Sequence, residues 1–122
     1  MLLVGCSRHH GLTRAQVESQ IAKDLPAGSN KDKILLHLDS QRIEHSGVSE
    51  IDPDILKDPR RDTFFYDAKL DGKRDRIKKQ IAAKIPDVKE DFFTKFDIYI
   101  RFYLDEHDNL VDSIVKTVGT GP

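Results

Sequence analysis

The side chains that most often perform catalysis are present, but they do not form a known catalytic pattern. The chain has one cysteine and five histidines, and it contains neither a Gly-x-Ser-x-Gly sequence nor a phosphate-binding loop. No two histidines have the i, i+4 spacing of a helical zinc site. Asp105, Glu106 and Asp108 lie in a polar stretch typical of a turn, without the spacing of a calcium loop. We therefore expect no catalytic residues, no metal and no cofactor.

Cys6 is predicted to carry a lipid. The run Leu3-Val4-Gly5-Cys6 resembles a bacterial lipobox, and several acyl chains on the thiol would anchor the protein stably. The segment before Cys6 contains no basic residue and is shorter than a working signal peptide, so either the start codon lies further upstream or the chain has been shortened. The alternative is an accidental apolar start with a free cysteine. We expect residues 1–12 to be a truncated lipoprotein signal and a tether.

Two further groups of residues could bind a partner. Lys73, Arg74 and Arg76 belong to the densest basic run and could contact phosphate or anionic lipid head groups, although a solvated surface segment is the favoured interpretation. Tyr99, Arg101 and Tyr103 alternate along a strand-like segment. Tyr and Arg dominate many protein interfaces, so these three residues are candidates for protein binding, with an ordinary outer sheet face as the equal alternative.

Composition limits the possible classes of protein. The chain of 122 residues suits one domain, with 38% hydrophobic and 34% charged residues. Its net charge of −1 provides no general attraction to nucleic acid, and no basic stretch is interleaved with aromatic residues. No segment approaches the roughly 20 apolar residues of a membrane span. Contact with a membrane would therefore depend on the lipid.

The first third of the chain is predicted to be a helical hairpin. Thr13 and Gln16 form a capping box, and Val17, Ile21 and Leu25 recur on one face of a helix over 13–24. Pro26 ends this helix, and Ser29 is the expected cap of a second helix, which ends near residues 41–42. A short extended segment is expected to follow at 43–46.

The middle of the chain is predicted to be a mobile loop over 46–76, rich in Gly, Pro and acidic residues. Phe64, Phe65 and Tyr66 are an apolar anchor that could open a short strand. Residues 73–88 are ambiguous, since their apolar positions fit either a helix or an alternating strand, and local propensity favours the helix.

The C-terminal third gives the clearest structural signal. Ile98, Ile100, Phe102 and Leu104 alternate with polar or amphipathic residues, which predicts a strand with one buried face. A polar turn over 105–109 leads into a second strand over 110–118. The apolar face of this hairpin must be covered, and the two amphipathic helices are the available cover.

The order of these elements and a few short motifs resemble a class of small bacterial envelope lipoproteins. The motifs are the lipobox, Leu12-Thr13 with Gln16-Val17, the Leu25-Pro26 elbow, and Phe102-Tyr103-Leu104-Asp105-Glu106. The class includes the small lipoprotein subunit of the outer-membrane barrel-assembly machinery and the repeats of β-lactamase-inhibitor proteins. The similarity covers roughly residues 3–43 and 77–122.

The resemblance implies an α+β fold, with an N-terminal helical hairpin packed on a three-stranded antiparallel meander (ααβββ). It therefore implies that residues 80–88 form the first strand, and this choice is adopted here over a helix. The expected organisation is a single domain over 13–122 after the tether. The resemblance also implies a non-enzymatic lipoprotein of the bacterial envelope, anchored through Cys6 and binding an envelope protein. Ser7 after the cysteine is compatible with sorting to the outer membrane, facing the periplasm. The alternatives are a periplasmic small-ligand-binding protein or hydrolase inhibitor.

Overall fold

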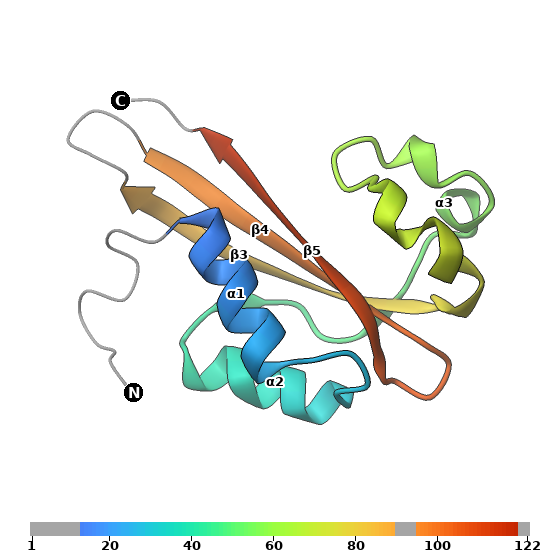
Figure 1. Cartoon of the computed structure of the whole chain (residues 1–122), viewed down its shortest axis with the longest axis horizontal. Helices are drawn as coiled ribbons and strands as arrows, with labels where there is room; N and C mark the ends of the chain where they lie inside the picture. The colour runs from blue at the N-terminus through green and yellow to red at the C-terminus, as the bar shows by residue number, and fades with distance from the viewer. Residues whose placement is uncertain (1–12, 90–94, 120–122) are drawn as a thin grey trace.

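The computed structural model describes residues 13–89 and 95–119, which form an α+β fold with an antiparallel sheet (Figure 1). The α+β class is therefore confirmed. The sheet contains more strands than the three predicted, because two short strands also pair with it. The main elements are helices α1 (Arg14–Asp24) and α2 (Lys31–Ser40) and strands β3 (Lys79–Lys89), β4 (Lys95–Leu104) and β5 (Leu110–Gly119).

Helix α1 begins at the predicted capping box. The Gln16 backbone N–H donates to the Thr13 Oγ1 over 3.1 Å, and the Thr13 N–H donates to the Gln16 Oε1 over 2.9 Å. Val17 and Ile21 on the apolar face of the helix are buried. The cap and the apolar spacing together explain why this helix is read correctly from the sequence.

In the elbow between the helices, the residue that caps α2 differs from the predicted one. The N-cap of α2 is Asn30, whose side-chain oxygen accepts the Asp32 N–H over 2.9 Å, and not Ser29 as predicted. Ser29 is buried, and its hydroxyl donates to the Pro26 carbonyl over 2.7 Å. This bond closes the turn, so the serine stabilises the elbow instead of the helix.

The sheet has the strand order β1-β3-β4-β5, with the short strands β1 (Glu44–His45) and β2 (Ser49–Glu50) both paired with β3. All of these pairings are antiparallel. The second part of the ambiguous segment 73–88 is a strand, because it belongs to β3. Residues Ala68–Arg76 form a 3₁₀ helix, η2. Two β-bulges interrupt the ladders, one between Ile85 and Val88 and one beside Leu104.

The first face of the sheet carries the main hydrophobic core. Helices α1 and α2 pack their apolar sides against alternate residues of β3, β4 and β5. The core includes Ile34, Leu38, Ile81, Ile98 and Phe102, each at most 1% exposed. The prediction that the helices cover the apolar face of the hairpin is thus confirmed.

The segment over residues 51–77, called the insertion below, lies against the opposite face of the sheet (Figure 1). It contains helix α3 (Pro53–Lys57), the 3₁₀ helix η1 (Pro59–Arg61) and η2. Phe64 and Phe65 lie in a turn and not in the short strand predicted from their aromatic character. The expected mobility of residues 46–76 stays a prediction.

Candidate functional site

Tyr99, Arg101 and Tyr103 point to the second face of the sheet, away from the helices. Contrary to the prediction of an outer face, part of this face is covered. Tyr103 is only 7% exposed. The insertion covers it with a second hydrophobic cluster, in which Tyr103 packs with Ile51, Phe65, Leu70, Ile77, Val111 and Ile114. These apolar side chains have little other surface against which to be buried, so the insertion docks on the sheet.

Arg101 joins the sheet to the insertion. Its guanidinium carbon lies 4.0 Å from the centre of the Phe65 ring, which is a cation–π contact. Its Nη1 donates to the Gln80 Oε1 over 2.8 Å and lies 3.8 Å from the Asp62 Oδ2. The Nε of Arg101 is buried and has no hydrogen-bond partner within the described residues. Arg101 therefore contacts residues of the fold itself on several sides, and its role in protein binding stays a prediction.

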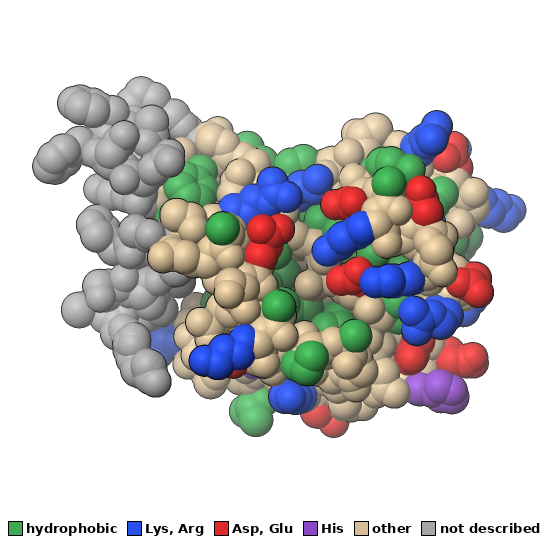
Figure 2. Space-filling view, viewed as in Figure 1, with side chains coloured by type: hydrophobic (Ala, Val, Ile, Leu, Met, Phe, Trp, Pro, Cys, Tyr) green, Lys and Arg blue, Asp and Glu red, His purple; other side chains and the backbone are tan. Residues whose placement is uncertain are grey.

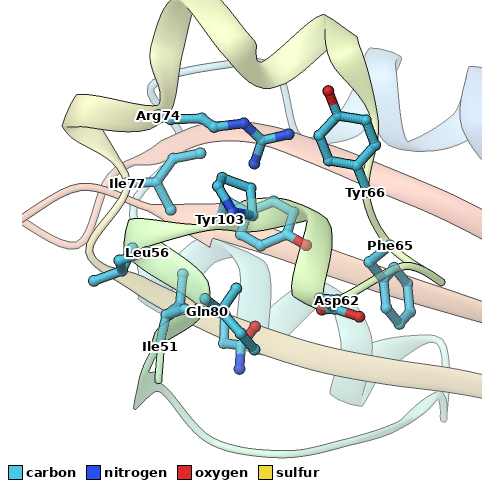
Figure 3. Close-up of a pocket in the computed structure, with 11 residues that line it drawn as sticks. Ile51, Leu56, Asp62, Phe65, Tyr66, Arg74, Ile77, Gln80 and Tyr103 are labelled. Atoms are coloured by element: carbon cyan, nitrogen blue, oxygen red, sulfur yellow. The ribbon is translucent and has the colours of Figure 1, made fainter. Parts of the chain in front are cut away.

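A small pocket lies between the insertion and the sheet (Figure 3). The Tyr103 ring lies between Arg74 and Gln80 in this view, with Asp62 and Phe65 at the far end. The cavity volume is about 40 Å³, which is room for about three water molecules. Burial, reinforced by the nearby Asp62, raises the pKa of Tyr103 to about 12. The pocket is thus a polar gap in a packed contact, with too little space to enclose a drug-sized molecule.

Tyr66 forms one rim of this pocket with two arginines. The guanidinium carbons of Arg74 and Arg60 lie 5.1 and 5.7 Å from the Tyr66 ring centre. Arg74 also pairs with Asp71, with 2.9 Å between Nε and Oδ1, and donates to the Asp67 carbonyl over 2.9 Å. The hydrogen bond from Arg74 is the main cause that lowers the pKa of Asp71. This rim is therefore held together by its own charges.

The residues predicted to bind anions do not converge on one point. The Lys73 Nζ lies 2.8 Å from the Asp112 Oδ2 of β5, so it ties the insertion to the sheet. Arg74 is committed to Asp71, and Arg76 is exposed. Figure 2 shows acidic and basic side chains interleaved over this part of the molecule. Mutual neutralisation of this kind favours the solvated-surface interpretation.

The insertion leaves part of the second face uncovered around Tyr99. The Phe64 ring is 40% exposed and meets Tyr99 edge to face, with 5.7 Å between ring centres. The Lys84 Nζ lies 5.5 Å from the Tyr99 ring centre, and Lys116 is directly opposite Tyr99 in the β4–β5 register. Val118, 38% exposed, continues this surface along β5. We call these five residues the aromatic patch.

Sequence reasoning found Tyr99 but missed Phe64 as its partner. The signal was present in the triplet Phe64-Phe65-Tyr66, where three consecutive aromatic residues cannot all be buried by one strand face. In the structure, Phe65 is buried, Tyr66 forms the pocket rim and Phe64 remains on the surface. The contact between Phe64 and Tyr99 depends on how the insertion folds back, which no local pattern encodes.

Cys6 and its tether lie outside the described residues. Within residues 13–89 and 95–119, no group of three or more His, Cys, Asp or Glu side chains is placed to hold a metal ion. In the same ranges, no helix is both long and apolar enough to cross a membrane.

Comparison of the chain with protein-family models, with curated proteins and with solved structures found no match.

Proposed function

We propose that this protein is a non-enzymatic interaction module, tethered to the bacterial envelope through Cys6, that binds another envelope protein through the aromatic patch. The observation that carries the proposal is the contact between the exposed Phe64 and the half-buried Tyr99, with Lys84 and Lys116 on either side of Tyr99. Aromatic rings supply most of the binding energy at many interfaces, and flanking charges select the partner.

The fold is compatible with this proposal. Two N-terminal helices cover one face of an antiparallel sheet, as in the small envelope lipoproteins that the sequence resembles. The two additional strands and the insertion set this chain apart from a plain ααβββ arrangement. Because the insertion covers part of the second face, the proposed binding surface is restricted to the end of the sheet near Tyr99. Outer-membrane localisation is part of the same proposal and depends on acylation of Cys6.

The size of the pocket favours a protein partner over a small ligand. A cavity of about 40 Å³ cannot enclose a typical metabolite. Four of the five residues of the aromatic patch, by contrast, lie on strands of the packed sheet, and such a rigid support reduces the entropic cost of binding. Inhibition of a periplasmic hydrolase would use the same kind of surface and would be one form of this proposal.

The binding surface can be tested by affinity capture from envelope extracts of the source bacterium. Phe64→Ser should reduce recovery of the partner at least about fivefold, since it removes the exposed ring of the patch. Leu36→Ser is the matched control, because Leu36 is 70% exposed and lies on α2, on the other side of the sheet. Equal recovery with wild type and Phe64→Ser would contradict the proposal.

The tether is tested separately. Metabolic labelling with a fatty-acid probe should mark the wild-type protein. The Cys6→Ser variant should carry no label and should no longer partition into a detergent phase. An unlabelled wild-type protein that stays in the aqueous phase would remove the envelope tether from the proposal and leave the aromatic patch to be judged by the capture experiment.

A further inference from the structure

Strand β5 forms one edge of the sheet, and its two halves differ in how that edge is used. In the first half, the elbow between α1 and α2 closes the edge. The Gly28 N–H donates to the Leu110 carbonyl over 2.7 Å, and the Leu110 N–H donates to the Ser29 carbonyl over 2.7 Å. The Ser113 N–H is occupied by the Asp112 side chain over 2.8 Å. The part of the edge from Leu110 to Ser113 is therefore already engaged.

The second half of β5 has no such cover within the described residues. In an antiparallel strand, alternate residues direct their N–H and C=O groups away from the neighbouring strand. Leu110 and Ser113, on either side of the bulge, form bonds directed away from β4. Val115 and Thr117 continue this alternation, so their N–H and C=O groups also point away from β4. In residues 13–89 and 95–119, residues 114–119 form no hydrogen bond outside the ladder with β4. Thr117 and Val118 are exposed, and both have high β-propensity. We call residues 114–119 the free edge.

Lys116 gives the free edge a charge preference. Its side chain lies on the second face, opposite Tyr99 and between Ile114 and Val118 along the strand. Within the described part of the chain, it forms no ion pair with a carboxylate, in contrast to Lys73 and Lys79. A strand added beside β5 would place one side chain directly opposite Lys116, and an acidic side chain is the stabilising choice there.

Pairing with a second copy of the same edge does not satisfy this lysine. In a twofold antiparallel pair, residues equally distant from the centre face each other. A pair centred on Lys116 sets two lysines opposite each other, which is destabilising, and a centre at Val115 or Thr117 sets Lys116 opposite Ile114 or Val118. Only a centre at Ile114 sets it opposite Asp112, and that carboxylate is already held by Lys73 at 2.8 Å and Lys69 at 3.6 Å. Lysine on an edge strand is also a common device against self-pairing.

We propose that the free edge of β5 accepts an extended segment of a partner protein as an additional strand, with an acidic side chain opposite Lys116. The inference rests on the proposed function and deepens it by naming the backbone surface and the class of partner. Backbone hydrogen bonds supply the affinity of such an addition, and alternate side chains supply its specificity. The segment presents an apolar, an acidic and an apolar side chain to the second face, opposite Ile114, Lys116 and Val118.

The proposal is tested with the full chain and the end-blocked peptide Thr-Val-Thr-Glu-Thr-Val-Thr, followed by backbone amide chemical shifts. Shift changes are expected at residues 113–119. Replacing the peptide Glu by Lys, or Lys116 by Glu in the protein, should weaken binding about fivefold each, and combining the two replacements should restore it. A peptide N-methylated on alternate residues is the control for backbone pairing and should not bind.

Three outcomes would overturn the inference. They are equal binding of the Glu and Lys peptides, shift changes outside β5 and its neighbours, or concentration-dependent self-association of the chain through β5 in place of peptide binding. None of these outcomes depends on capture through Phe64. Failure of the edge and failure of the aromatic patch can therefore be told apart.

Discussion

The guanidinium of Arg101 on β4 lies over the ring of Phe65 in the insertion, with 4.0 Å between the guanidinium carbon and the ring centre. This contact brings together a sheet residue and a residue 36 positions earlier in the chain. It fixes how the insertion lies on the sheet, and so it also fixes Phe64 against Tyr99. The aromatic patch therefore depends on the buried contact beside it.

Replacing Phe65 should destabilise the protein far more than replacing Phe64, although the two residues are neighbours in sequence. Phe65 is 6% exposed, whereas Phe64 is 40% exposed. Phe65→Ala should lower the free energy of unfolding by about 3 kcal/mol, because it removes a buried ring and leaves a cavity. Phe64→Ala should cost less than about 1 kcal/mol. Urea denaturation of both variants measures the difference, and equal losses would show that Phe65 does not anchor the insertion.

Elements whose stabilising signals lie within their own residues can be predicted from the sequence, whereas elements that depend on pairing with a distant segment cannot. Helix α1 has a cap and an apolar repeat within its own residues, and β4 has apolar residues at alternate positions. Both signals are local, and they correctly locate these elements. Strands β1 and β2 have two residues each, which is too short for a periodic pattern, so their pairing with β3 is decided by the sheet alone.

The insertion shows the same limit for the candidate site. Ile51, Phe65, Leu70 and Ile77 are spaced irregularly, because turns and 3₁₀ segments present them to the sheet. Without a period, the sequence gives no sign that they form a second core over Tyr103. Alternation places Tyr99, Arg101 and Tyr103 on the correct face of the sheet, but their exposure depends on this distant segment.

Tyr103 should make the stability of the protein fall at high pH. Burial raises the pKa of its phenol to about 12 in the folded state, above the ordinary value near 10. The folded state therefore keeps this proton while the unfolded state loses it, so stability is full below pH 10 and is lost as the pH rises towards 12. Absorbance of the phenolate should show a titration step near pH 12 that belongs to Tyr103.

Tyr103→Phe provides the control for this assignment, since it keeps the ring in place. The variant should lose this titration step and should show a flatter stability curve between pH 10 and 12. A step near pH 12 that survives in Tyr103→Phe would show that it does not belong to Tyr103.

His45 should stabilise the fold most when it is protonated. Its Nδ1 lies 2.6 Å from the Ser46 carbonyl and its Nε2 lies 2.6 Å from the Asp39 Oδ1, so both ring nitrogens act as donors in the charged form. The Ser46 bond is the main cause that raises the pKa of His45, and Asp39 adds to it. The contribution is fully present below pH 6.5 and is lost as the pH rises through the raised pKa.

The measurement is the pH titration of the histidine ring protons by NMR, together with stability at pH 6 and pH 8. Burial lowers the pKa of His37, which gives a pH dependence of the opposite sign. His37 is therefore retained in both proteins, and the difference between wild type and His45→Gln isolates His45. The difference should be larger at pH 6 than at pH 8, and the reverse order would refute the assignment.

Glycine should be required at position 28 in the elbow because of the backbone conformation there, and not because a larger side chain would clash. Its φ of +94° lies in the region that favours glycine, and an added Cβ would meet nothing within 4 Å. Gly28→Ala should therefore destabilise the protein by about 1 kcal/mol through backbone strain alone. Strain there would also weaken the Gly28–Leu110 hydrogen bond that closes the first half of the β5 edge.

Gly72 is the matched control, since a Cβ there also meets nothing within 4 Å, and its φ is not in the left-handed region. Gly72→Ala should be neutral or stabilising by about 0.5 kcal/mol, because alanine reduces the entropy of the unfolded chain. Thermal denaturation of the two variants gives the comparison. A Gly28→Ala variant as stable as Gly72→Ala would show that the elbow can adopt another turn, and amide exchange at Leu110 would then reveal whether the edge had opened.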